Sequence, residues 1–146
     1  MAGVVAHFRI LACALALAVT LGAGSLAALE DADRSAARSV IEKQIDAFRR
    51  DDAAAAFGLA APSIQGMFPT QELFLDMVRR GYAPVYRPRS FEFGPVRESG
   101  EGIEQAVRVQ DGEGVDWDAV YSLERQPDGT WRISGCRLVK RPGEAV

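Results

Sequence analysis

The stretch VDWDAVYSLERQPDGTWRISGCRLVK, residues 115–140, decides the fold. In its first half apolar side chains occupy every second position, at Val115, Trp117, Ala119, Tyr121 and Leu123. This period of two is typical of a strand with one buried face and one solvated face. The tripeptide Pro-Asp-Gly at residues 127–129 is a strong turn signal. We therefore predict an antiparallel hairpin whose strands cover residues 115–126 and 130–140.

The second strand of this hairpin has an interrupted pattern. Trp131 and Ile133 share one face, but Cys136 and Leu138 fall out of phase with them. A bulge near Gly135 would restore the phase, because it adds one residue to one strand of a pair. Upstream, residues 103–110 and 90–93, or 90–97 at the longest, are two further strand candidates. The C-terminal half of the chain therefore predicts a four-stranded antiparallel sheet.

The residues before the sheet predict three helices. In the first, over residues 35–50, apolar side chains recur every three or four positions on one face, namely Ala37, Ile41, Ile45 and Phe48. A second, short helix spans residues 53–60, with Asp51 or Asp52 as its N-cap. Thr70 caps a third helix over residues 71–80. Its inward side chains are expected to be Leu73, Phe74, Met77 and Val78.

Two connecting segments are predicted to be irregular. Residues 62–69 form a loop, and residues 82–89 run extended over the surface because they contain Pro84 and Pro88. Helices followed by strands indicate the α+β class. We expect three N-terminal helices packed on a curled four-stranded antiparallel sheet, preceded by a signal peptide. The sheet must curl around the helices to bury its aromatic face.

Residues 1–28 have the pattern of a secretory signal peptide. Arg9 is followed by an uncharged Ala/Leu/Val run, and small residues then close the segment before the acidic cluster that begins at Glu30. We expect cleavage there, a single domain over residues 29–146, and a periplasmic or secreted location. The alternative is an uncleaved leader that anchors the protein, because the uncharged run is about long enough to span a bilayer. Otherwise no membrane contact is expected.

Removal of the leader limits the chemistry of the rest. His7 is the only histidine and lies in the leader, as does Cys13, so Cys136 is left without a disulfide partner. No imidazole then remains for a metal site or a catalytic pair, and we expect neither a metal nor a cofactor. The chain has 17 Lys and Arg against 20 Asp and Glu, a formal net charge of −3, which argues against nucleic acid as a partner.

Several stretches resemble known proteins. Residues 44–48, 51–52 and 56–57 resemble the opening of the nuclear-transport-factor-2-like superfamily, whose members are cone-shaped α+β rolls. Residues 60–68, 77–82, 85–88 and 129–136 are similar to an exported bacterial family known as domain of unknown function 4864. The likeness covers essentially the whole mature chain. It implies a single roll-like domain but no catalytic residues, because the family has no established activity and the superfamily includes both enzymes and binding proteins.

Four aromatic side chains are candidates for a ligand pocket. They are Tyr82, Tyr86, Trp117 and Tyr121, whose rings and polar tips suit an orienting site; the alternative is core packing with each tip bonded to the fold. A cofactor-free enzyme, such as an isomerase or dehydratase, would pair one tyrosine with a buried carboxylate. Glu92 is the only ambiguous candidate, because it lies between Phe91 and Phe93.

These patterns favour a non-catalytic module that binds an unidentified small molecule or protein. The resemblance to the superfamily of α+β rolls additionally implies a homodimer through the outer sheet face. The first alternative is the cofactor-free enzyme. The second is an envelope assembly accessory protein that uses Ile64, Met67 and Phe68 as its contact. A local basic stretch, formed by Arg79, Arg80, Arg87 and Arg89, indicates either an anion site or a solvated surface.

Overall fold

A computed structural model describes residues 29–143 of the protein. Five helices come first: α1 (Asp31–Arg49), α2 (Ala53–Gly58), α3 (Pro62–Gln65), α4 (Gln71–Gly81) and α5 (Ala83–Tyr86). Four strands follow: β1 (Ser90–Ser99), β2 (Gly102–Gln110), β3 (Asp116–Arg125) and β4 (Trp131–Lys140). The α+β class is therefore confirmed. The predicted signal peptide, residues 1–28, lies outside the described residues.

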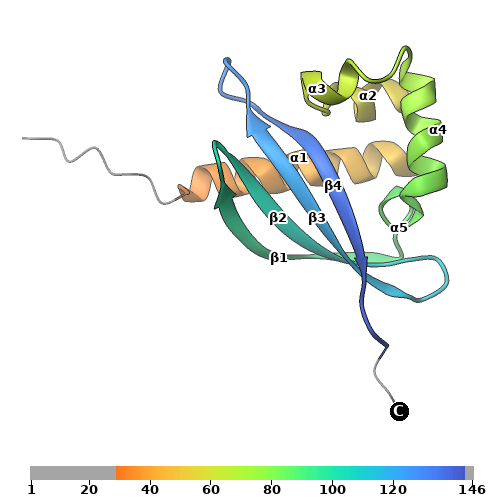
Figure 1. The fold of residues 1–146 in the computed structure, drawn as a ribbon. Helices are drawn as coiled ribbons and strands as arrows, with labels where there is room; N and C mark the ends of the chain where they lie inside the picture. The colour runs from red at the N-terminus through yellow and green to blue at the C-terminus, as the bar shows by residue number, and fades with distance from the viewer. Residues whose placement is uncertain (1–28, 144–146) are drawn as a thin grey trace, which may run out of the picture.

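The strands form one antiparallel sheet in the order β1-β2-β3-β4, and the sheet is curled (Figure 1). The predicted bulge is present in β4. Ser122 pairs with Gly135 and the next residue, Leu123, pairs with Ile133, so Ser134 is the extra residue. Cys136 consequently lies opposite Tyr121 and joins the inner face of the sheet. The first strand runs past residue 97, and a second irregularity falls between Phe93 and Val96.

Helix α1 lies across one face of the sheet, and α2, α3, α4 and α5 gather near its C-terminal end (Figure 1). The predicted stripe of α1 is confirmed, because Ala37, Ile41, Ile45 and Phe48 are all buried. The N-caps of α2 and α4 are also as predicted. The Ala55 N–H donates to Asp52 at 3.0 Å, and the Leu73 N–H donates to Thr70 at 3.2 Å.

The interior has two apolar clusters. The first, here called the sheet-side core, joins α1 to the inner face of the sheet and includes Ile41, Ile45, Val107 and Tyr121. The second, here called the helix-end core, is formed by Ala47, Phe48, Ala56, Phe74, Leu75 and Val78. Within the described part of the chain, no helix is long and apolar enough to cross a membrane.

Two of the five helices were not predicted. Helix α3 occupies part of the expected loop, and α5 occupies part of the segment expected to be extended. The reason is the same in both, because Pro62 and Pro84 stand in the first helical turn, where a proline loses no hydrogen bond and its fixed φ suits the helix. The prediction of three helices was wrong for this reason.

The inward face of α4 also differs from the prediction. Leu73 is 50% exposed, whereas Leu75 is only 4% exposed. Helix α4 packs its buried residues, Phe74, Leu75 and Val78, into the helix-end core with Phe48 and Ala56. The apolar pattern of a short helix does not determine which of two adjacent faces is buried. Packing of α4 against α2 selects the face that contains Leu75.

Candidate ligand pocket

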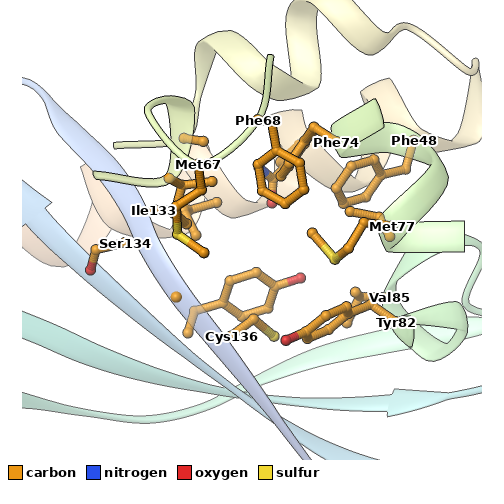
Figure 2. Close-up of a pocket in the computed structure, with 16 residues that line it drawn as sticks. Phe48, Met67, Phe68, Phe74, Met77, Tyr82, Val85, Ile133, Ser134 and Cys136 are labelled. Carbon is orange, nitrogen blue, oxygen red and sulfur yellow. The ribbon is translucent and has the colours of Figure 1, made fainter. Parts of the chain in front are cut away.

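A pocket of about 370 Å³ lies between the helix-end core and the inner face of the sheet. That volume lies within the range of small-molecule sites. Its apolar lining comes from both sides: Phe48, Ala60, Ile64, Met67, Phe68, Phe74, Met77, Val78, Val85, Ile133 and Gly135. Figure 2 shows the phenylalanine rings and Met67 on one side, and Tyr82 and Cys136 on the other, with Met77 reaching between them. The lining is therefore predominantly apolar.

The polar part of the lining is small and uncharged. It consists of Gln44, Tyr82, Tyr121, Ser134 and Cys136. Within the described part of the chain, no Asp, Glu, Lys or Arg side chain lines this pocket. An ionised ligand group buried here would consequently have no counter-charge.

The strand β4 and the segment before α3 are joined at one wall. The Ala61 N–H donates to the Ile133 carbonyl at 2.7 Å, and the Ile133 N–H donates to the Leu59 carbonyl at 2.9 Å. The bulge at Ser134 comes next in the chain, and it places Ser134 and Gly135 in the lining. The irregular step of β4 thus forms part of the site, as bulges often do.

Tyr121 is the most enclosed polar side chain of the pocket. It is 1% exposed, and its hydroxyl oxygen has no hydrogen-bond partner within residues 29–143. Burial raises the pKa of this hydroxyl well above 10.0, with a further contribution from Cys136. The phenol is therefore neutral at physiological pH and retains its proton.

Gln44 and Cys136 are two further polar side chains of the lining. The Gln44 amide nitrogen donates to the Ala56 carbonyl at 3.1 Å, which joins α1 to α2. The Cys136 thiol is more enclosed than the residue as a whole, and burial raises its pKa to about 12. A thiol with that pKa is almost wholly protonated at neutral pH and is a poor nucleophile.

The four predicted pocket residues divide into two pairs. Tyr82 and Tyr121 both line the pocket, and Figure 2 shows the Tyr82 hydroxyl directed toward Cys136. Trp117 lies near the start of β3, before Tyr121, and its Nε1–H donates to Asp111 at 3.0 Å. Tyr86 packs on Phe48 from the helix-end core. Trp117 and Tyr86 are not among the lining residues.

The hydroxyl of Tyr86 belongs to a surface cluster of charges. It donates to Asp51, whose carboxylate also accepts from Arg79 at 3.2 Å and from Arg87 at 2.8 Å. These partners, the Tyr86 hydrogen bond foremost, lower the pKa of Asp51. Asp51 has a positive φ of 52°, so the cluster also fixes an unusual backbone conformation after α1. Part of the basic stretch is thus paired within the protein.

The candidate catalytic carboxylate lies outside the pocket. Glu92 is exposed and pairs across the sheet with Arg108, on the face opposite Phe91 and Phe93. Asp118 lies across from Arg108 on the same outer face. In the part of the chain that the structure covers, no group of His, Cys, Asp and Glu has a geometry that could hold a metal ion.

The segment expected to contact a partner is only partly exposed. Met67 is 71% exposed, but Ile64 and Phe68 are half-buried against the helix-end core. All three side chains line the pocket. The segment is therefore an edge of the pocket.

Sequence reasoning missed most of the lining. Gln44 was the one polar residue with a detectable signal, because it falls on the buried stripe of α1, three residues after Ile41. Met77 and Phe74 were recognised as inward-facing but were assigned to the core. The periodicity of apolar residues predicts which face of a helix or strand is buried. It does not show whether that face contacts a packed core or a pocket.

Comparisons with known proteins agree on the architecture. The family model described as Domain of unknown function (DUF4864) matches residues 30–146. A solved structure, an NTF-2 like protein of unknown function from Silicibacter pomeroyi, aligns with a TM-score of 0.50 at 16% identity. The alignment covers 74% of this chain and 95% of that one, and it supports the fold alone. A comparison with curated proteins finds no match.

Proposed function

The chain belongs to the family described as Domain of unknown function (DUF4864), and on that premise we propose that it is a non-catalytic module that binds a small, largely apolar molecule. The observation that carries this proposal is the uncharged lining of the pocket. A general acid or base would have to come from that lining, and carboxylates are absent from it among the described residues. Apolar walls with a few polar groups suit binding instead.

The cofactor-free enzyme receives less support from the same residues. Tyrosine hydroxyls are present, but Glu92 and Asp118 lie on the outer face of the sheet. Cys136 is a poor nucleophile because of its raised pKa. With neither an acid/base pair nor an activated nucleophile, binding is the better proposal.

We propose that the protein acts after export, in the periplasm or outside the cell. The support is the composition of residues 1–28, with Arg9 before an uncharged run and acidic residues after it. An apolar pocket would serve there to carry or sequester a molecule of low solubility.

The homodimer also stays a prediction. The outer sheet face carries a row of alternating charge, Glu92, Arg108 and Asp118, in register across three strands. An ion-paired group on the sheet also joins Glu104 to Arg97 and Arg137. Any second copy would have to pack against these charged side chains.

Native mass spectrometry of the protein isolated from its own cells tests export, assembly and binding together. We expect the mass of a chain that starts near residue 29 and an added mass from a retained small molecule. An intact leader would contradict export by cleavage. The number of chains in the ion gives the oligomeric state.

A titration with N-phenyl-1-naphthylamine, an uncharged fluorophore that brightens in apolar surroundings, tests the pocket. Met77→Trp should fill the space and weaken binding at least about tenfold. Leu73→Trp is the matched control, because Leu73 is on the same helix but is 50% exposed and does not line the pocket. Binding that is absent in the parent protein, or equally lost in both variants, would contradict the proposal.

A further inference from the structure

We propose that the ligand is an uncharged apolar molecule with one hydrogen-bond acceptor oxygen, such as a ketone, ester or quinone carbonyl, and that this oxygen accepts from the hydroxyl of Tyr121. The inference rests on the proposed binding function and names the class of ligand. Its basis is an orphaned hydroxyl in the wall of an uncharged pocket. A buried hydroxyl without a partner is costly, and such groups in native proteins need an explanation.

Trp117, Trp131 and Tyr86 differ from Tyr121 in the hydrogen bonding of their polar atoms. The Nε1–H of Trp117 donates to Asp111, and that of Trp131 donates to Asp33 at 3.2 Å. The hydroxyl of Tyr86 donates to Asp51. Each of these tips is bonded to the fold, whereas the Tyr121 hydroxyl, the most deeply buried polar tip, is not.

The residue opposite Tyr121 on β2 has its amide nitrogen bonded elsewhere. Gln105 faces Tyr121 across β2 and β3, and its carbonyl oxygen is also buried without a partner. The Gln105 amide nitrogen donates to the carbonyls of Gly94 at 2.9 Å and Ala106 at 2.8 Å, and its carbonyl oxygen does not bond to the Tyr121 hydroxyl. These contacts fix the amide toward the irregular step of β1. Within residues 29–143 the Tyr121 hydroxyl therefore has no acceptor.

The hydroxyl is suited to donate to a ligand. A phenol is a better donor than acceptor, because its oxygen lone pair is delocalised into the ring. Burial raises the pKa of Tyr121, so the proton is retained over the whole physiological range. A carbonyl oxygen is the simplest group that accepts this proton and requires no counter-charge.

The remaining lining excludes charged ligands and indicates an orientation. A buried carboxylate or ammonium group would lack an opposite charge, since the described lining residues are uncharged. Met67, at 71% exposed, marks the side of the pocket that solvent reaches. The acceptor oxygen would accordingly lie at Tyr121, with the apolar body between Met77 and Phe68 and its far end toward Met67.

Three naphthalenes of similar size test this inference by calorimetric titration of the parent protein and of two variants. They are 2-acetylnaphthalene, which has a ketone, 2-ethylnaphthalene, which has no polar atom, and 2-naphthoate, which is charged. We expect the ketone to bind roughly tenfold more tightly than the hydrocarbon, and the carboxylate to bind most weakly. The carbonyl stretching band of the bound ketone should move to lower frequency.

Tyr121→Phe should abolish the preference for the ketone and return its carbonyl band to the unbonded frequency. Tyr82→Phe is the matched control, since it removes a hydroxyl from the same pocket, and it should keep most of the preference. The thermal midpoint of Tyr121→Phe should not fall, which separates a lost contact from a damaged fold.

Two results would overturn the inference while leaving the binding function intact. One is a ketone preference that survives in Tyr121→Phe, and the other is tight binding of 2-naphthoate. If none of the naphthalenes binds and N-phenyl-1-naphthylamine also fails to bind, the proposed function fails as well. The two proposals thus have distinguishable failures.

Discussion

Trp117 and Tyr121 lie on the same face of β3, yet their polar atoms end in different surroundings. The indole N–H of Trp117 donates to Asp111, whose carboxylate also accepts from the N–H groups of Glu113 and Val115 at 2.9 Å. The hydroxyl of Tyr121 has no such partner in the described chain. The hairpin loop next to Trp117 supplies a carboxylate, whereas a pocket lies next to Tyr121.

The sheet-side core and the pocket also differ in how completely they are filled. Ile41 and Ile45, from α1, are fully buried in the sheet-side core. At the pocket, Met77 is half-buried and Met67 is exposed. The comparison indicates that the sheet-side core is filled around α1, while packing is incomplete at the pocket. Natural binding sites commonly have this cost.

The largest expected effect is on packing. Ile41→Ala should lower the free energy of unfolding by about 2–5 kcal/mol, because it opens a cavity in a filled core. Met77→Ala should cost only about 1 kcal/mol, because it enlarges a space that already exists. Urea denaturation of both variants measures the difference. Equal losses would mean that the pocket wall is packed as tightly as the core.

The second effect separates the two aromatic residues of β3. Trp117→Phe removes a donor and part of a ring, and it should lower the free energy of unfolding by about 1–3 kcal/mol. Tyr121→Phe should leave that free energy unchanged or raise it by up to about 1 kcal/mol, because it deletes a buried hydroxyl without a partner. A clear loss of stability in Tyr121→Phe would show that the fold does bond this hydroxyl.

The fold and the pocket were not equally predictable from the sequence. The hairpin, including the bulge before Gly135, followed from the phase of Trp131, Ile133, Cys136 and Leu138. The stripe of α1 and the caps Asp52 and Thr70 were also clear. These features are local, since each depends on spacing within one element.

Helices α3 and α5 were missed for a local reason, a proline in the first helical turn, whereas the other failures were tertiary in origin. Leu73 and Leu75 both fit an apolar face, and contact with the helix-end core chose Leu75. Tyr86 and Tyr121 could not be separated, because their surroundings come from distant segments: Tyr86 is bonded to Asp51, while Tyr121 has no partner in the described chain. No spacing in one sequence encodes an absent hydrogen bond.

The groups next to Trp117 and Tyr121 should also affect stability at opposite extremes of pH. Hydrogen bonds from Trp117 first, and then from Val115, lower the pKa of Asp111 below 3.8. Its contribution to stability is present above that value and is lost as the pH falls through the folded pKa. The pKa values of Cys136 and Tyr121 are raised, to about 12 for Cys136, so their contribution is lost as the pH rises above about 9.

Urea midpoints measured from pH 3 to pH 11 test this division. Asp111→Asn should flatten the acid side of the profile without changing the alkaline side. Cys136→Ala should flatten the alkaline side of the profile without changing the acid side. If either variant altered both sides, the two regions would be coupled and the comparison would be wrong.

The smallest effect concerns the exposed edge of the pocket. Met67→Ser should change the free energy of unfolding by less than about 0.5 kcal/mol, because the side chain is 71% exposed. Affinity for N-phenyl-1-naphthylamine should still fall a few fold, since Met67 contributes apolar surface to the lining. Unchanged affinity would place the ligand deeper than Met67 reaches.

The free hydroxyl of Tyr121 also has a genetic consequence. A tyrosine codon becomes a phenylalanine codon by one nucleotide change, and here the product should be at least as stable as the parent. Mutation alone would therefore remove this oxygen readily, and no penalty in folding would select against the loss. Lineages that still use the pocket should retain tyrosine at this position, and lineages that have abandoned the ligand should drift to phenylalanine.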